Sequence, residues 1–361
     1  MAYAYSNKIT NREETLMKIA LMSGAFVNAG DFLIEERCKS LLEANISDAH
    51  IDIFKRNISY DDKVDMLNDD YDMIVFGGGP GFQKNIYPDR MPFVSDISKI
   101  TTPIAIMGWG WKGADCSDVE VYRGKAFSPA MQQFIHHISR QSTHIGCRDW
   151  YTVNMLKEAG ITNTIMTGCP AWYRLDLIEN LHLKKRGILS NPKPVIMISD
   201  PAFPENMDYM RALLETVHKA YPQAHIKILL HRGSRNIIDG LTKKLKQIRF
   251  HYEIDAISGS SEGFKQYESC DLHIGFRVHA HIYNLSMGTP SILINEDARG
   301  SGVNDALGIR NVSINKYLDK QLYDYFDYLE ATDLYQYERA CDAIKFYYAA
   351  MQKYIGELKN R

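Results

Sequence analysis

Two side chains that can bind an anion and move a proton stand two positions apart late in the chain. Arg277 and His279 belong to the segment GFRVHAHI, which follows an expected strand over 271–274. An arginine carries a permanent charge and a planar fork of donors that fits a carboxylate or a phosphate. A histidine changes its charge near neutral pH and can act as a general acid or base. The pair therefore predicts acid–base chemistry on an anionic substrate.

A second histidine, His281, raises the alternative of a metal site. Zinc sites are completed by further histidine, cysteine or carboxylate ligands, often in an HExxH or a CxxC pattern. The sequence contains neither pattern. We therefore expect no metal and no bound cofactor, and we expect His281 to point into the packing of its helix and His273 to sit within a buried strand.

An early segment combines small residues with the start of a helix. The stretch SGAFVNAGD, residues 23–31, places Asn28, Gly30 and Asp31 directly after the first expected strand. Small residues let the backbone approach a ligand, and the start of a helix favours an anion. The alternative interpretation is an ordinary turn in which Asn28 or Asp31 caps the helix. The local sequence supports both interpretations equally.

A glycine-rich run, GGGPG at residues 77–81, follows the third expected strand. It matches neither the GxGxxG dinucleotide motif nor the GxxxxGK[ST] phosphate loop. The run indicates a sharp turn or a close approach of the backbone to another group. We assign Gly78 and Gly79 to substrate contact on that basis.

Two further strand ends carry charged or polar residues. Arg148 stands where a loop meets a helix that Asp149 can cap, so it can bind an anion or form a salt bridge to a neighbouring element. The segment 296–305 contains Glu296 and Ser301 and is interpreted either as a loop that covers or contacts a ligand or as a solvated turn capped at Ser301 and Asn304.

The elements that must position these residues alternate between strands and helices. Apolar runs without period-two alternation are typical of parallel strands that are buried on both faces, and the helices between them predict a doubly wound α/β fold. The expected strands are 18–22, 50–54, 72–76, 103–107, 164–167, 194–199, 225–230, 271–274 and 290–295. The expected helices include 32–42, 129–139, 151–158, 207–220 and 236–247.

A polar stretch with two prolines, residues 184–194, separates two such α/β halves. We predict an N-terminal Rossmann-like domain over 1–187 and a second Rossmann-like domain over 188–314. The remaining residues, 315–361, are predicted to form helices. Apolar and tyrosine residues recur at helical spacing over 344–358, so the last helix is expected to pack back on the body and to cross to the first domain.

Composition excludes several classes of protein. The chain is 45% hydrophobic and 24% charged and has a formal net charge of −2, which argues against a nucleic-acid binder held by bulk charge. No apolar run approaches the length of a membrane span, and no apolar signal core is present near the start, so we expect a cytoplasmic protein with buried, reduced cysteines. A basic helix with Lys243, Lys244, Lys246 and Arg249 is interpreted as a solvated face or, alternatively, as a contact with an anionic membrane.

Taken together, the motifs resemble the polysaccharide pyruvyl transferase family. The resemblance extends over about residues 18–309, and Val278 stands where the family often has leucine between the arginine and the histidine. The motifs that carry it are Asn28-x-Gly30-Asp31, Gly77–Gly79, Arg148-Asp149, Gly168-Cys169-Pro170-Ala171, Arg277-x-His279 and Ser286-x-Gly288-x-Pro290.

The resemblance implies two Rossmann-like domains that face a cleft, similar to the GT-B glycosyltransferases. It also implies transfer of pyruvate from phosphoenolpyruvate onto two hydroxyls of a sugar as a cyclic ketal. The acceptor would be a glycan or a lipid-linked sugar of a surface polysaccharide, and the reaction would take place at the inner face of the membrane. Arg277 and Arg148 would bind the donor and His279 would transfer protons. Two alternatives stay open: a nucleotide-sugar glycosyltransferase in which Glu296 or Asp297 holds a ribose, and a glycan-binding relative without activity.

Overall fold

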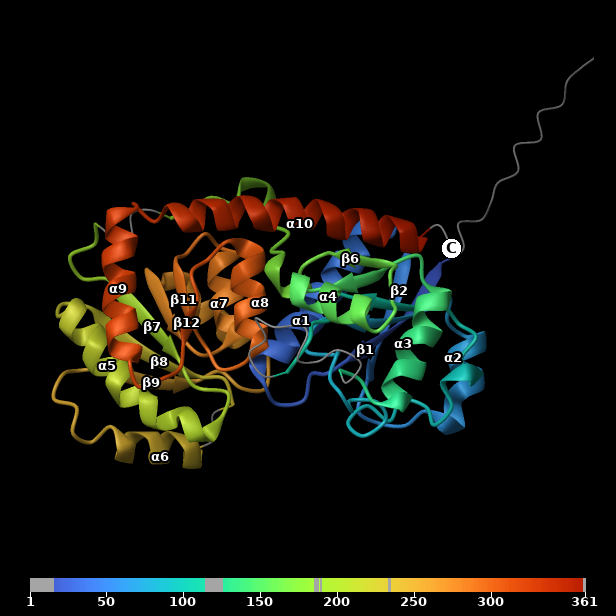
Figure 1. Ribbon diagram of the computed structural model, residues 1–361, viewed down its shortest axis with the longest axis horizontal. Helices are drawn as coiled ribbons and strands as arrows, with labels where there is room; N and C mark the ends of the chain where they lie inside the picture. The colour runs from blue at the N-terminus through green and yellow to red at the C-terminus, as the bar shows by residue number, and fades with distance from the viewer. Residues whose placement is uncertain (1–15, 114–125, 185–187, 189, 233–234, 360–361) are drawn as a thin grey trace, which may run out of the picture.

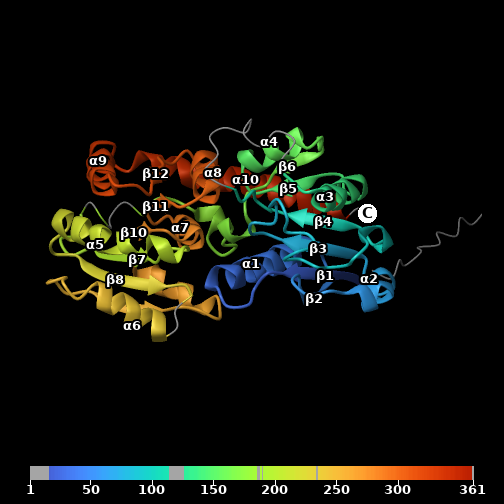
Figure 2. The same ribbon diagram turned by 60° about the horizontal axis from the view of Figure 1, so that its bottom comes forward.

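The computed structural model describes residues 16–113, 126–184, 188, 190–232 and 235–359. Two parallel sheets lie side by side along the long axis of the molecule (Figures 1 and 2). The first is drawn in blue to green and the second in yellow to orange-red. Each sheet is built from one half of the chain, as the alternation of apolar runs and helices predicts.

The first sheet has the strand order β2-β1-β3-β4. Its strands are β1 (Met17–Ser23), β2 (Ala49–Lys55), β3 (Met73–Gly77) and β4 (Ile104–Met107), and all of them pair in parallel. The parallel pair β5 (Ile145–Cys147) and β6 (Thr164–Met166) continues this sheet, because the Gly108 amide donates to the Gly146 carbonyl at 3.0 Å. The helices of this half are α1 (Ala29–Asn45), α2 (Val64–Asp69), α3 (Pro129–Gln141) and α4 (Trp150–Glu158).

The second sheet has the order β12-β11-β10-β7-β8-β9. Its parallel strands are β7 (Val195–Ser199), β8 (His225–Leu230), β9 (Glu253–Ala256), β10 (Leu272–Gly275), β11 (Ser291–Asn295) and β12 (Val312–Ser313). Counted within this half, the order from β9 to β12 is 3-2-1-4-5-6, the arrangement of a Rossmann sheet, and it reverses between β7 and β10. The helices are α5 (Tyr209–Ala220), α6 (Arg235–Lys244), α7 (Val278–Leu285) and α8 (Ala298–Leu307).

Two C-terminal helices complete the chain, α9 (Leu318–Ala331) and α10 (Tyr335–Lys359). The long helix α10 lies across both halves (Figure 1). Near its start the Tyr337 hydroxyl donates to the Ser291 carbonyl of β11 at 2.9 Å. Near its end the Tyr354 hydroxyl donates to the Ile106 carbonyl of β4 at 2.7 Å. The prediction that the last helix crosses back to the first half is confirmed.

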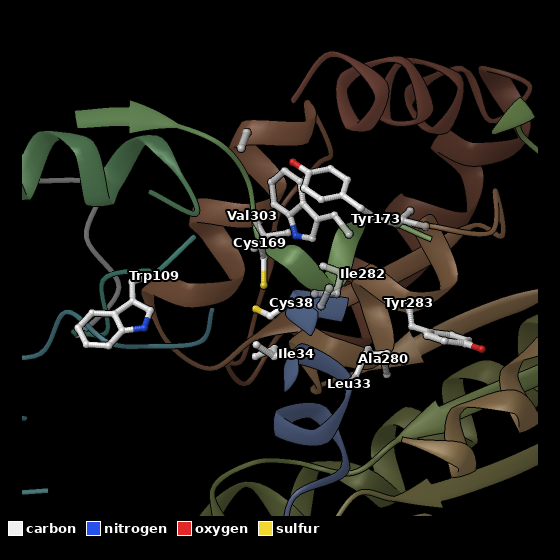
Figure 3. Close-up of a cluster of buried hydrophobic side chains, with 14 of the residues drawn as sticks. Leu33, Ile34, Cys38, Trp109, Cys169, Tyr173, Ala280, Ile282, Tyr283 and Val303 are labelled. Atoms are coloured by element: carbon white, nitrogen blue, oxygen red, sulfur yellow. The ribbon is translucent and has the colours of Figure 1, made fainter. Parts of the chain in front are cut away.

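An apolar contact also joins the two halves directly. Helix α1 packs against α7 and against the short 3-10 turn Pro170–Trp172, and the Arg37 guanidinium donates to the Tyr173 carbonyl at 2.9 Å. Burial of this surface holds the end of α1 that faces the second half in a fixed place. Figure 3 shows its side chains, which include Leu33, Ile34, Cys38, Cys169, Tyr173, Ala280 and Ile282.

The nine strands expected from apolar runs are confirmed to within about one residue at each end. Three others were not assigned: β5, β9 and β12 are two to four residues long, and the last two stand at the edges of the sheet. The predicted domain boundary after residue 187 lies outside the described residues, so the division at 187 and 314 stays a prediction. The cysteines that the structure describes are buried free thiols. No described helix is long and apolar enough to cross a membrane.

Candidate functional site

The carboxyl ends of both sheets face one cleft of about 300 Å³. From the first half, residues that follow β1 to β6 line it; from the second half, residues that follow β7, β8, β10 and β11 line it. Ligands of open α/β sheets bind at carboxyl strand ends, above all where the strand order reverses. The cleft is therefore the candidate active site, and it contains Arg277, His279, Arg148, Asn28, Asp31 and Gly79 from the sequence prediction.

Arg277 is held rigidly at the end of β10. Its Nε donates to Asp200 Oδ1 at 2.8 Å and its Nη2 donates to Asp200 Oδ2, while its amide donates to Ser199 Oγ at 3.1 Å. Asp200 and Ser199 end the adjacent strand β7. Burial would lower the pKa of Arg277, but the charge and hydrogen bonds of Asp200 outweigh burial and raise it. The guanidinium is thus a fixed, permanent cation at the strand reversal.

A buried chain of hydrogen bonds supports that strand end from behind. His273 Nε2 pairs with Ser199 Oγ at 2.9 Å and His273 Nδ1 pairs with Ser291 Oγ at 2.7 Å. Ser291 Oγ also pairs with His281 Nδ1 at 2.7 Å. Both histidines are fully buried, as the sequence predicts, and burial lowers the pKa of both. They therefore support the strand as neutral rings and take no part in lining the cleft.

His279 lies in the first turn of α7, which begins directly after Arg277. The ring packs against Gly30 of α1, so closely that a Cβ added at Gly30 would overlap it. Burial lowers the pKa of His279 to about 4; Arg299, Arg148 and Arg277 lower it too, and Asp31 raises it in part. His279 is uncharged at neutral pH and is ready to accept a proton.

Arg148 enters the cleft from the first half, directly after β5. Its Nε donates to Asp149 Oδ2 at 2.7 Å and its Nη2 donates to the Trp111 carbonyl at 3.0 Å. Asp149 caps α4 as predicted, by accepting from the Thr152 amide at 2.8 Å. Gly110 leaves the space that the guanidinium fills, since a Cβ there would overlap it. Arg148 thus lines the cleft and forms its salt bridge with the adjacent Asp149 instead of a neighbouring element, and anion binding by Arg148 stays a prediction.

The predicted residues near the start of α1 and in the turn after β3 have different roles. Asn28 occupies the N-cap position of α1 but its side chain makes no capping hydrogen bond, so its amide can face the cleft that it lines. Asp31 also lines the cleft, in the first turn of α1. Gly79 contributes backbone to the cleft, whereas Gly78 packs against Ile34. Both glycines have positive φ (+76° and +45°), which accounts for glycine in this turn.

Glu296 and Ser301 are not among the residues that line the cleft. Glu296 accepts hydrogen bonds from the Ala202 amide at 2.8 Å and from Asn206 Nδ2 at 2.7 Å, so it fixes the loop after β7. Ser301 is buried within α8 and pairs with Asn295.

The expectation of a loop or turn over 296–305 is wrong, because α8 begins at Ala298 within this segment. Asp297, and not Ser301 or Asn304, caps the helix by accepting from the Arg299 amide at 3.0 Å. Gly300 and Gly302 are poor helix formers, and they concealed the helix in the sequence. Both are required by packing, since a Cβ would meet Asn295 at Gly300 and Asp149 at Gly302.

Most of the positive charge in the cleft was not predicted from the sequence. Among the described lining residues seven are cations and only Asp31 is an acid. The five cations that were not predicted are Arg56, Arg90, Lys112, Arg232 and Arg299. A signal was present, because Arg56 directly follows β2 and Arg232 follows β8 by two residues. Within the described ranges, no group of three potential metal ligands occurs.

A family model described as polysaccharide pyruvyl transferase matches residues 28–298, which include the strand ends from the start of α1 to the start of α8. No curated protein sequence matches the chain.

Solved structures share the fold at low sequence identity. The UDP-GlcNAc 2-epimerase of Neisseria meningitidis bound to UDP-GlcNAc is 14% identical, with 96% of this chain and 100% of that chain covered and a TM-score of 0.58. The S. aureus MnaA structure with UDP is 11% identical, with 91% of each chain covered and a TM-score of 0.57. Anabaena HepE in complex with UDP and glucose is 12% identical, with 95% and 99% covered and a TM-score of 0.52. These likenesses show the fold, which is the GT-B-like pair of facing Rossmann-like halves.

Proposed function

Since the chain belongs to the polysaccharide pyruvyl transferase family, we propose that it transfers pyruvate from phosphoenolpyruvate onto two hydroxyls of a sugar as a cyclic ketal. The observation that carries the proposal is the meeting of Arg148, Arg277 and His279 in one cleft, the first from the end of β5 and the other two from the end of β10. Two fixed cations and one uncharged base are what a small dianionic or trianionic enol phosphate needs.

The donor is proposed to bind between Arg277 and Arg148. Each guanidinium already uses two nitrogens for its own carboxylate or carbonyl partner, which fixes its orientation. The remaining Nη1 of each is left for the carboxylate and the phosphate of phosphoenolpyruvate. Donors that are fixed before the substrate arrives lose no orientation energy during the reaction and can stabilise charge on the departing phosphate. We propose no cofactor for this step.

The reaction needs balanced proton movements. The methylene carbon of phosphoenolpyruvate takes up one proton, and a first sugar hydroxyl adds to the adjacent carbon. The bond from that carbon to the phosphate oxygen then breaks, and a second hydroxyl of the sugar adds to the same carbon. The two hydroxyls release two protons; one balances the new methyl proton and the other leaves with the phosphate. His279, uncharged at neutral pH, is proposed to accept the hydroxyl proton and, once charged, to serve as the acid.

The acceptor is proposed to be a glycan or a lipid-linked sugar of a surface polysaccharide, pyruvylated in the cytoplasm at the inner face of the membrane. The basic residues of the α6 region, such as Lys243 and Lys244, are exposed and can make a peripheral contact with anionic lipid. No membrane insertion is needed for such a contact.

The proposal is tested by thermal shift with phosphoenolpyruvate, UDP, a CMP-linked sugar and NAD, for wild type and for Arg277→Ala. We expect stabilisation by phosphoenolpyruvate that is lost in the variant, because a ligand that binds only the folded state raises the melting temperature of the protein. Release of inorganic phosphate that requires both phosphoenolpyruvate and a sugar would then identify the acceptor. Stabilisation by UDP or by the CMP-linked sugar without a response to phosphoenolpyruvate would reject pyruvyl transfer in favour of glycosyl transfer.

A further inference from the structure

The cations of the cleft fall into two groups that differ in how their charge is balanced. Around His279 stand Arg148 and Arg277, and each is paired with its own buried carboxylate. Arg90, Lys112 and Arg232 also line the cleft, and the charges of the two arginines act on Lys112. None of these three forms an ion pair with a carboxylate among the described residues. The second group thus holds positive charge that the protein itself leaves unbalanced.

Lys112 is the centre of this second group. It is partly buried in the segment that follows β4, and its Nζ lies 5.9 Å from the centre of the Phe203 ring on the opposite wall of the cleft. Burial lowers the pKa of the Lys112 amine. The positive charges of Arg299, Arg90 and Arg232 lower it further, and Asp297 raises it only in part. Charges of one sign held together in a partly buried site are unfavourable unless an anion binds between them.

Arg299 lines the same cleft, and its charge acts on both groups. Its charge lowers the pKa of both His279 and Lys112, and its own guanidinium is fixed by Asp297 with Nε–Oδ contacts of 2.8 Å. The two groups are therefore neighbouring parts of one cleft. A ligand that fills both must carry an anionic group for each group of cations.

We propose that Arg90, Lys112 and Arg232 form a second anion subsite, which binds a phosphate or diphosphate group carried by the acceptor sugar. The proposal rests on the proposed function, in which phosphoenolpyruvate occupies Arg148 and Arg277. Lysine and arginine side chains on several loops can bind the negatively charged oxygens that are distributed over the two phosphates of a diphosphate. The acceptor then enters the cleft as a phosphorylated or diphosphate-linked sugar, with its hydroxyls directed at His279.

The test uses calorimetric titration of the full chain with inorganic pyrophosphate, with and without saturating phosphoenolpyruvate. We expect pyrophosphate to bind in both conditions. Lys112→Gln and Arg90→Gln should each weaken pyrophosphate binding by about tenfold, the effect of losing one charge-assisted hydrogen bond, and should leave phosphoenolpyruvate affinity within about twofold. Lys157→Gln and Arg249→Gln, at exposed positions outside the cleft, are the matched controls and should bind like wild type.

Three results would overturn the proposal: no binding of pyrophosphate, its displacement by phosphoenolpyruvate, or equal weakening of both ligands by the two variants. The last two would mean that the cleft has one anion site, which serves the donor. Failure of the proposed function would give a different result. Phosphoenolpyruvate would then not bind, whereas pyrophosphate would still bind and its binding would still depend on Lys112. A diphosphate with a carrier, UDP or farnesyl diphosphate, should bind at least as tightly as pyrophosphate, and the tighter of the two indicates the carrier. Weaker binding of both would reject assignment of the subsite to the acceptor.

Discussion

Asp200 and Arg277 are joined by two hydrogen bonds across the ends of the adjacent strands β7 and β10. Asp200 Oδ1 accepts in addition from the His231 amide at 3.0 Å. The two side chains are 3% and 7% exposed, so water cannot replace either partner. The pair therefore fixes the direction of a cation and also ties two strand ends and the start of the loop after β8 into one unit.

Removal of the Asp200 charge should affect both stability and donor binding. In Asp200→Asn an amide nitrogen would face the guanidinium, which leaves a buried charge without its counter-ion. We expect the free energy of unfolding to fall by about 3–5 kcal/mol, as is usual when one partner of a buried ion pair is lost. Phosphoenolpyruvate affinity should fall as well, since Arg277 loses its fixed orientation. Urea denaturation and calorimetric titration measure the two effects.

Asp208→Asn is the matched control, because Asp208 pairs with Lys244 on the exposed surface. A surface pair of this kind contributes about 0–1 kcal/mol, so the control should remain close to wild type. If both variants lost similar amounts of stability, the Asp200–Arg277 pair would have no special structural role.

Close packing of α1 on α7 gives a second prediction, at Gly30. Alanine is the better helix former by about 1 kcal/mol, so a helical glycine replaced by alanine should stabilise the protein where space allows. At Gly30 the added Cβ would overlap the His279 ring and push it from its place in the cleft. We expect Gly30→Ala to lower turnover by at least about tenfold, because a small displacement of a catalytic group is costly.

Gly240→Ala provides the comparison for this variant. Gly240 lies in α6 with no atom within 4 Å of an added Cβ. That variant should keep wild-type turnover and gain stability in thermal unfolding. Unchanged turnover in Gly30→Ala would show that His279 does not depend on its contact with α1.

The apolar strands and the chemistry at their ends could be predicted from the sequence because both are local patterns. Continuous apolar runs marked β1 and β7, and polar residues after such runs marked Arg148 and Arg277. Pairing between distant residues left no such pattern. Asp200 and Arg277 are 77 positions apart, and only the strand order brings them together. The pairing of Asp200 with Arg277 could therefore not be derived before the strand order was known.

The charge of the cleft was missed for a related reason. The net charge of the chain is −2, and an average of this kind conceals a local excess. Arg90 lies in the loop after β3. Arg299 lies in α8, a helix that the sequence did not predict because it contains two glycines. Each residue is unremarkable in its own segment. They form a cationic site only because both sheets direct their carboxyl ends at the same cleft.

The low pKa of His279 predicts how its charge changes with pH. The free protein should show half protonation of His279 near pH 4 and not near 6.5, because burial and neighbouring arginines disfavour the imidazolium. Bound phosphoenolpyruvate brings negative charge next to the ring and should raise this pKa. Carbon-13 labelled histidine and NMR titration measure both values, with His279→Gln used to assign the signal.

Turnover gives an independent check on the same residue. His279→Gln should lower the rate by about 10²–10⁴-fold if the ring transfers protons. A titration midpoint of His279 near 6.5 in the free protein would show that the ring is solvated, and near-wild-type turnover of the variant would assign proton transfer to another group.

Three fully buried histidines predict a loss of stability in acid. His231, His273 and His281 are 0% exposed, and burial lowers the pKa of each, to about 3 for His281. Below the unfolded pKa of about 6.5 the unfolded chain binds protons that the native protein does not, so the native state loses stability as pH falls. The contribution is fully present above pH 6.5 and is lost progressively toward the folded pKa values.

Each of the three histidines adds a slope of about 1.4 kcal/mol per pH unit below pH 6.5, so the three together add about 4 kcal/mol per pH unit. Urea unfolding at pH 7.5, 6.5 and 5.5 should show this steepening, and His281→Asn should reduce the slope by about 1.4 kcal/mol per pH unit, the contribution of one group. An equal slope in wild type and variant would mean that His281 is protonated in the native protein.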